Sequence, residues 1–185
     1  MFFIPLFSGC WSAVPLTLNE IQKYISVKEQ SFTYSNYKLV GVSANSLKKM
    51  GFELEKILVF SEKGFINASW KGTHVSIELI SNTPSLTTIK SKITTDQFGR
   101  EHAIEEELFN NIRSTLDQGI YPNLRKQIIG MIKVYSAPKR DSIVIGYLRP
   151  GIVITAKSKQ KEWTKLDLGE SVYGYILSYN IKQSN

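Results

Sequence analysis

The sequence has little of what catalytic and metal sites are usually built from: it contains one cysteine and two histidines in 185 residues. A single cysteine excludes an internal disulfide framework and any zinc site made of several thiolates. The motifs GxxxxGK[ST], GxGxxG and HExxH are also absent from the sequence. We therefore expect a protein without cofactor or metal that is not an enzyme.

Acidic residues are scarce in the C-terminal third. Residues 1–120 contain 12 Lys/Arg and 12 Asp/Glu, whereas residues 121–185 contain 11 Lys/Arg and 4 Asp/Glu, so the formal charge of +7 lies in the second part. This asymmetry predicts two units, the second able to meet phospholipid headgroups, an acidic polymer or nucleic acid. A charged surface that only confers solubility is the alternative.

The apolar run at the start, Met1 to Phe7, is shorter than the roughly 20 residues of a membrane-spanning helix. It is followed by Ser8-Gly9-Cys10, which fits the last three positions of a lipobox. We interpret residues 1–10 as a truncated lipoprotein signal whose true start lies upstream, and Cys10 as the lipidation site. Phe7 and the missing basic residue depart from the usual pattern, and a strand ending in a buried cysteine is the alternative.

Lipidation of Cys10 would anchor the chain through acyl chains, each buried methylene contributing about 0.8 kcal/mol. Residues 11–34 would then form a tether to the first folded unit. Because Trp11 rather than Asp follows the cysteine, nothing resembles an inner-membrane retention signal. The expected location is the outer membrane, facing the periplasm.

Residues 35–119 change from helical to strand periodicity and back. Apolar residues three or four apart predict one helix from Ser35 to Phe52 and another over residues 101–119. Between them, alternation predicts strands in ELEKILVF, GFINASW, THVSIELIS and SLTTIKSKIT. The predicted fold is an α+β domain of helix, four-stranded antiparallel sheet and helix, with both helices on one face.

After a linker over residues 120–130, the pattern becomes one of short strands and turns. Five strands are predicted within residues 131–185, in MIKVYSA, SIVIGYL, IVITAKSK, EWTKLDL and VYGYILS. Their number and spacing are typical of a small all-β barrel.

The C-terminal unit resembles a bacterial SH3 domain. The resemblance is carried by VYSAP at 134–138, SIVIG at 142–146, EWTKL at 162–166 and GYI at 174–176, and it spans nearly all of residues 131–182. It implies an SH3-like barrel with an aromatic groove for extended peptides, here peptidoglycan stem peptides or a protein partner.

The candidate groove residues are aromatic and lie near strand ends: Tyr135, Trp163, Tyr173, Tyr175 and Tyr179. Basic residues flank them, which would also permit binding of single-stranded nucleic acid. A lipoprotein outside the cytoplasm would rarely meet nucleic acid. The other alternative is that Trp163 and Tyr175 belong to the barrel core.

Residues 35–119 resemble a family of small bacterial lipoprotein domains of unknown function. The resemblance rests on LKKMGFELE at 47–55, the strand at 73–79 and TTIKSKI at 87–93. Members of that family commonly begin directly after a lipobox cysteine, and the resemblance implies no known chemistry.

Two polar clusters could suggest other chemistry. His74 shares a strand face with Ser76 and Glu78, but such neighbours lie about 7 Å apart, beyond hydrogen-bond reach. His102 with Glu105 and Glu106 has helical spacing, yet one histidine with carboxylates is a poor zinc set, and these acids would complement the helix dipole.

Together these features predict a non-catalytic envelope lipoprotein whose SH3-like unit binds a peptidoglycan stem peptide or a protein partner. One alternative is an accessory subunit that targets a separate cell-wall hydrolase. A cytoplasmic nucleic-acid-binding protein is the third hypothesis.

Overall fold

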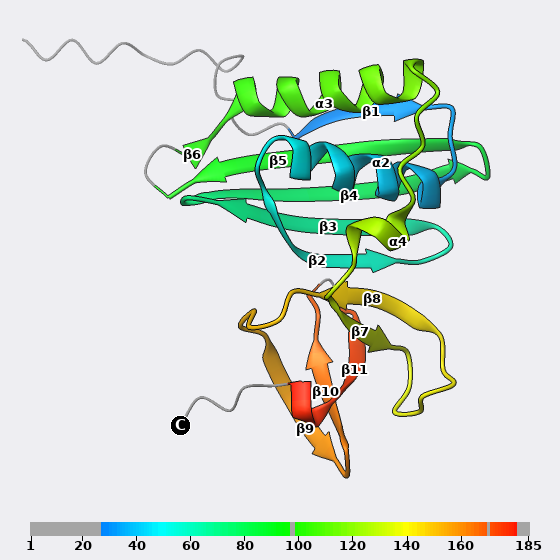
Figure 1. Cartoon of the computed structure of the whole chain (residues 1–185), viewed down its shortest axis with the longest axis vertical. Coiled ribbons are helices and arrows are strands. Elements are labelled where there is room, and N and C mark those ends of the chain that lie inside the picture. The colour runs from blue at the N-terminus through cyan, green and yellow to red at the C-terminus, as the bar shows by residue number, and fades with distance from the viewer. Residues whose placement is uncertain (1–26, 97–98, 170, 181–185) are drawn as a thin grey trace, which may run out of the picture.

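The computed structural model describes residues 27–96, 99–169 and 171–180 (Figure 1). The predicted lipobox and Cys10 lie outside the described residues, as does most of the predicted tether over residues 11–34.

Strands dominate the described residues. The strands are β1 Lys28–Phe32, β2 Glu53–Val59, β3 Lys63–Trp70, β4 Thr73–Thr83, β5 Leu86–Thr95, β6 Gly99–Arg100, β7 Ile132–Tyr135, β8 Val144–Leu148, β9 Thr155–Gln160, β10 Trp163–Asp167 and β11 Tyr173–Leu177. The helices are α2 Asn36–Lys49, α3 His102–Asp117, α4 Leu124–Gln127 and the 3-10 helix Ser178–Asn180. Within the described ranges, no helix combines the length and apolarity needed to cross a membrane.

Each of the two long helices ends two residues before the glycine that was expected to terminate it. Gly51 has φ of 88° just after α2, and Gly119 has φ of 67° just after α3. Glycine adopts this left-handed conformation without the steric cost that a Cβ imposes.

All described strands belong to one antiparallel sheet (Figure 1). Its order is β1-β5-β4-β3-β2-β8-β7-β11-β10-β9, and β6 pairs with β5. The two parts of the chain meet where β2 pairs with β8, with Ile57 opposite Tyr147 and Leu58 opposite Gly146.

The predicted fold class is therefore wrong. We expected a helix, a four-stranded sheet and a helix followed by a separate SH3-like barrel, but the C-terminal strands continue the first sheet through β8, and β1 and β6 extend it on the other side. Alternation identifies strands but not their partners. An open edge such as that of β2 carries unpaired N–H and C=O groups that a distant strand can satisfy.

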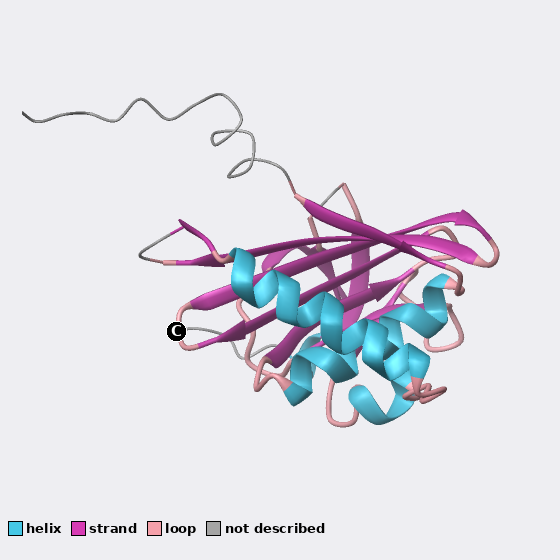
Figure 2. Ribbon diagram, turned by 90° about the horizontal axis from the view of Figure 1, so that it is seen from above, coloured by secondary structure: helices cyan, strands magenta, loops and turns pink. Residues whose placement is uncertain are grey.

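The first hydrophobic core lies between the sheet and its helices. Figure 2 shows the helices gathered on one side of the strands. Leu39 and Leu47 of α2 and Leu108 and Ile112 of α3 are fully buried against sheet residues such as Ile77. Burial of these amphipathic faces stabilises helices that would be marginal in isolation.

A second core lies on the opposite face of the continuous sheet. It contains Leu58, Val134, Leu166 and Ile176. Strand β2 contributes to both cores, because Ile57 belongs to the first and its neighbour Leu58 to the second. Successive strand residues point to opposite faces of the sheet. The face that packs against the helices at β2 is therefore the outer face of the C-terminal strands, whose core lies on the opposite face.

Candidate ligand-binding face

Four of the five predicted groove residues share one face of β7, β11 and β10. Tyr175 lies opposite Tyr135 of β7 and opposite Lys165 of β10. Trp163 and Tyr173 lie on the same face, because each is two positions from Lys165 or Tyr175 along its strand. We call Tyr135, Trp163, Tyr173 and Tyr175 the aromatic face.

Gly174 explains why two tyrosines of β11 point to this face. A Cβ on Gly174 would clash with the Val134 side chain and lie 3.0 Å from Leu168 Cδ1, both in the second core. Glycine is therefore required on the core side, and the flanking Tyr173 and Tyr175 alternate to the other side.

The aromatic face has a supporting ring and more accessible rings. Trp163 is only 5% exposed, and its ring meets Tyr135 edge-to-face at a centroid distance of 5.4 Å. Tyr173 is 46% exposed and Tyr175 is half-buried. Trp163 thus supports the surface, whereas Tyr173 and Tyr175 can contact a ligand. Trp163 is buried, which agrees with the alternative interpretation of it as a core residue, although it lies outside the second core, whereas Tyr175 is half-buried.

The charge beside these rings is positive. Lys165 Nζ lies 4.5 Å from the Tyr173 ring centroid, a cation–π contact. Asp167 shares this face, but its carboxylate is 3.2 Å from Lys157 Nζ. The Gly169 backbone N–H, which donates to Asp167, and the hydrogen bond from Lys157 lower the pKa of this carboxyl. Asp167 therefore stays ionised and paired, which leaves Lys165 available to an anionic group.

Tyr179 is not placed with the aromatic face by the strand register. It lies in the 3-10 helix Ser178–Asn180 that follows β11, and its side chain is 77% exposed. It serves below as a comparison residue.

The structure adds two residues that sequence reasoning missed, Lys133 and Tyr147. They lie opposite each other on β7 and β8, on the same face as Tyr135. Alternation could have identified Tyr147, because its neighbours Gly146 and Leu148 are both buried on the opposite side. Lys133 and Tyr147 extend the aromatic and basic surface from β7 across β8 toward β2.

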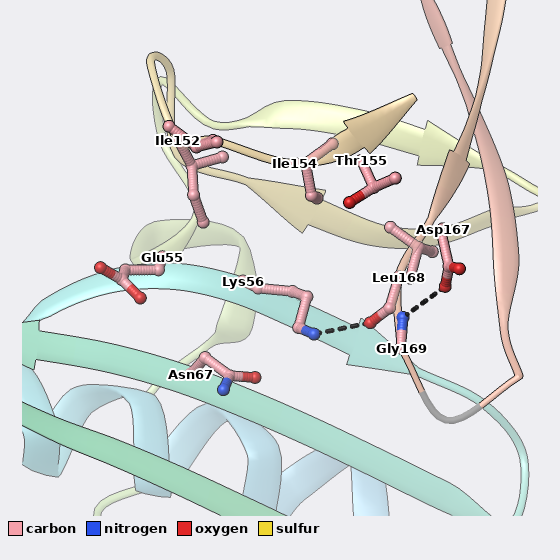
Figure 3. A pocket seen from close by; sticks show the side chains of 10 residues that line it. Glu55, Lys56, Asn67, Ile152, Ile154, Thr155, Asp167, Leu168 and Gly169 are labelled. Atoms are coloured by element: carbon pink, nitrogen blue, oxygen red, sulfur yellow. Dashed lines mark hydrogen bonds between the residues drawn. The ribbon is translucent and has the colours of Figure 1, made fainter. Parts of the chain in front are cut away.

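A polar hollow of about 330 Å³ lies on the opposite face of the sheet (Figure 3). Lys56 crosses it from β2, and its Nζ donates to the Leu168 carbonyl at 2.7 Å. Glu55 at its border accepts a hydrogen bond of 2.6 Å from Ser69 and lies 3.5 Å from the Arg149 guanidinium. Because these groups bind one another, we interpret the hollow as a structural clamp between β2 and the end of β10.

The two polar clusters considered from sequence have structural partners. His74 Nε2 lies 3.1 Å from Asp96 Oδ1 on an exposed surface. Glu105 is fully buried and pairs with Arg100 at 2.8 Å, with His102 Nδ1 at 3.4 Å. From the sequence we expected Glu105 to interact with the helix dipole, and we did not expect its buried ion pair with Arg100. In the part of the chain that the structure describes, no group of three or more His, Cys, Asp or Glu side chains could hold a metal ion.

No protein-family model matches this chain, and no match to it was found among curated proteins.

Proposed function

We propose that this protein is a non-catalytic binding protein of the bacterial envelope whose aromatic face holds a peptidoglycan stem peptide. The observation that carries the proposal is the strand register, which brings Tyr135, Tyr173 and Tyr175 to one face beside Lys165. A protein partner with an acidic, extended segment would engage the same chemistry.

The chemistry of the face suits such a ligand. Tyrosine rings provide rigid apolar area at low conformational cost, and their hydroxyls can hydrogen-bond to peptide groups. Stem peptides carry free carboxylates, and Lys165 is held beside the exposed ring of Tyr173. A carboxylate at this position would gain a charge-assisted hydrogen bond.

The ligand interaction is testable with the full chain and a soluble stem tetrapeptide. We expect Tyr173→Ala and Lys165→Met each to weaken binding about tenfold, which corresponds to about 1.4 kcal/mol. Isothermal titration calorimetry measures the dissociation constants. Both residues are accessible enough for the variants to remain folded, unlike the buried Trp163.

Tyr179→Ala is the matched control, since it removes an exposed tyrosine that the register does not place on the face. Its affinity is expected to equal that of the wild type. Equal losses in Tyr173→Ala and Tyr179→Ala, or no binding of the tetrapeptide by the wild type, would contradict the proposal.

The envelope location is part of the same proposal and rests on the lipobox pattern around Cys10. In cells labelled with a palmitate analogue, the full-length gene product is expected to carry the label and Cys10→Ala to lose it. If both proteins carry the label equally, or if neither carries it, the lipoprotein interpretation is wrong. The resemblance to bacterial SH3 domains stays a prediction.

A further inference from the structure

A second cluster of tyrosine and basic side chains lies where α2 meets α4. It surrounds a hollow of about 380 Å³, lined among others by Tyr37, Lys38, Tyr121 and Arg125. This volume lies within the usual range of small-molecule sites, roughly 300–1,000 Å³. We call it the Tyr121 hollow.

Lys38 is held in place by two rings of this cluster. Its Nζ lies 3.1 Å from the Tyr121 ring centroid and 4.4 Å from that of Tyr34. The two tyrosine rings lie 6.0 Å apart, and the hydrogen bond between their hydroxyls is the main cause that raises the pKa of Tyr34. The ammonium and the rings therefore form one preorganised group.

The segment that carries Tyr121 is also fixed by packing. Gly41 of α2 is buried, and a Cβ on it would lie only 2.5 Å from the Pro122 carbonyl oxygen. Leu124, at the start of α4, is 3% exposed within the first core. The hollow is thus built by close backbone packing and does not depend on a loose loop.

The hollow still presents groups to solvent. Tyr37 is 55% exposed and Tyr121 is 49% exposed. Within the described part of the chain, the Arg125 guanidinium makes no ion pair. Two accessible rings and hydrogen-bond donors from Lys38 and Arg125 can receive a flat, hydroxyl-rich ligand.

Tyr147 connects the Tyr121 hollow with the aromatic face. Burial is the main cause that raises the pKa of Tyr147. The Tyr37 and Tyr135 hydroxyls raise this pKa further, whereas the Arg125 guanidinium lowers it. Tyr147 lies opposite Lys133 of β7 on one side, and its register position beside Ile57 of β2 puts it on the side of the sheet that carries α2 and α4.

We propose that the Tyr121 hollow binds a sugar ring of the glycan whose stem peptide lies on the aromatic face. This inference rests on the proposed function, because the stem peptide is joined covalently to a sugar of the glycan strand. A ligand held through its peptide must place that sugar next to the peptide's first residue.

The donors in the hollow favour a neutral sugar over a nucleic acid. The Lys38 ammonium makes cation–π contacts with the Tyr34 and Tyr121 rings, and its N–H groups can donate hydrogen bonds to hydroxyl or acetamido oxygens. Among the described residues, the lining of the hollow contains two cations, Lys38 and Arg125, whereas binding of a polyphosphate backbone depends on several. Exposed tyrosine rings supply the flat apolar surface for the face of a pyranose.

The test compares two soluble ligands on the full chain: a disaccharide-tetrapeptide and the free tetrapeptide. We expect the wild type to bind the disaccharide-tetrapeptide about tenfold more tightly. Tyr121→Ala should abolish that advantage and leave tetrapeptide affinity unchanged, whereas Tyr173→Ala should weaken both ligands. Thermal unfolding of each variant confirms that it is folded, and Tyr37→Ala provides an independent variant of the same hollow.

The outcomes separate this inference from the proposed function. If the tetrapeptide binds and the disaccharide adds no affinity, or if neither Tyr121→Ala nor Tyr37→Ala reduces the advantage, this inference alone is overturned. If neither ligand binds, both proposals are overturned. If oligothymidine binds instead, with losses in Tyr121→Ala, the hollow belongs to nucleic acid and the sugar assignment is wrong.

Discussion

Replacing Glu105 with alanine is expected to lower the free energy of unfolding by about 3–5 kcal/mol, the usual cost of breaking a buried ion pair from one side. Glu105 is fully buried and accepts hydrogen bonds from Arg100 Nε and from the Ile93 backbone N–H, both at 3.0 Å. The Arg100 side chain is 6% exposed, so the variant leaves a buried cation without its carboxylate. Urea denaturation followed by circular dichroism measures the change.

Glu106→Ala is the control for this experiment. Glu106 is the next residue of α3, is 69% exposed and lies 3.9 Å from Lys28. Exposed pairs of this kind contribute at most about 1 kcal/mol. If both variants lose the same stability, the buried pair does not anchor the start of α3 to β5 and β6 as the structure indicates.

Gly146→Val is expected to cost about 3 kcal/mol or more, at the upper end of overpacking effects. The reason is the junction between β2 and β8. A Cβ at this position would lie 2.6 Å from the Ile57 carbonyl oxygen and 2.5 Å from Leu58 Cδ2, so the strands would have to move apart. Besides lower stability, we expect faster proteolysis after β8 because the junction opens.

Ala156→Val provides the comparison, since it places the same valine side chain at an exposed position of strand β9. Its stability should stay within about 0.5 kcal/mol of the wild type. A Gly146→Val protein as stable as the Ala156→Val protein would show that β8 does not depend on close contact with β2.

Local sequence patterns predicted much of the candidate site. The alternation in Tyr173-Gly174-Tyr175 places both tyrosines on one side, and the register of β10 and β11 adds Lys165 to them. The same reasoning could have included Tyr147. It could not include Tyr121 or Lys38, because the contact between α2 and the segment before α4 depends on Gly41 and on burial of Leu124.

Glu105 shows that local sequence patterns also fail to predict a buried ion pair. Its place in the first turn of a helix suggests interaction with the helix dipole, and the sequence gives no sign that Arg100 turns back to meet it. The pair forms because β6 brings Arg100 beside β5, and the Ile93 backbone N–H of β5 donates a further hydrogen bond to Glu105.

Periodicity and terminal glycines depend only on neighbouring residues, and they predicted the positions of the main helices and strands. Local patterns did not predict that these strands form one sheet or that two cores lie on opposite faces of it, because both depend on contacts between distant segments. The physical reason is that pairing between β2 and β8 joins residues about ninety positions apart. Backbone hydrogen bonds are alike at every position, so only the packing of particular side chains, such as Leu58 against Gly146, selects the partner strand.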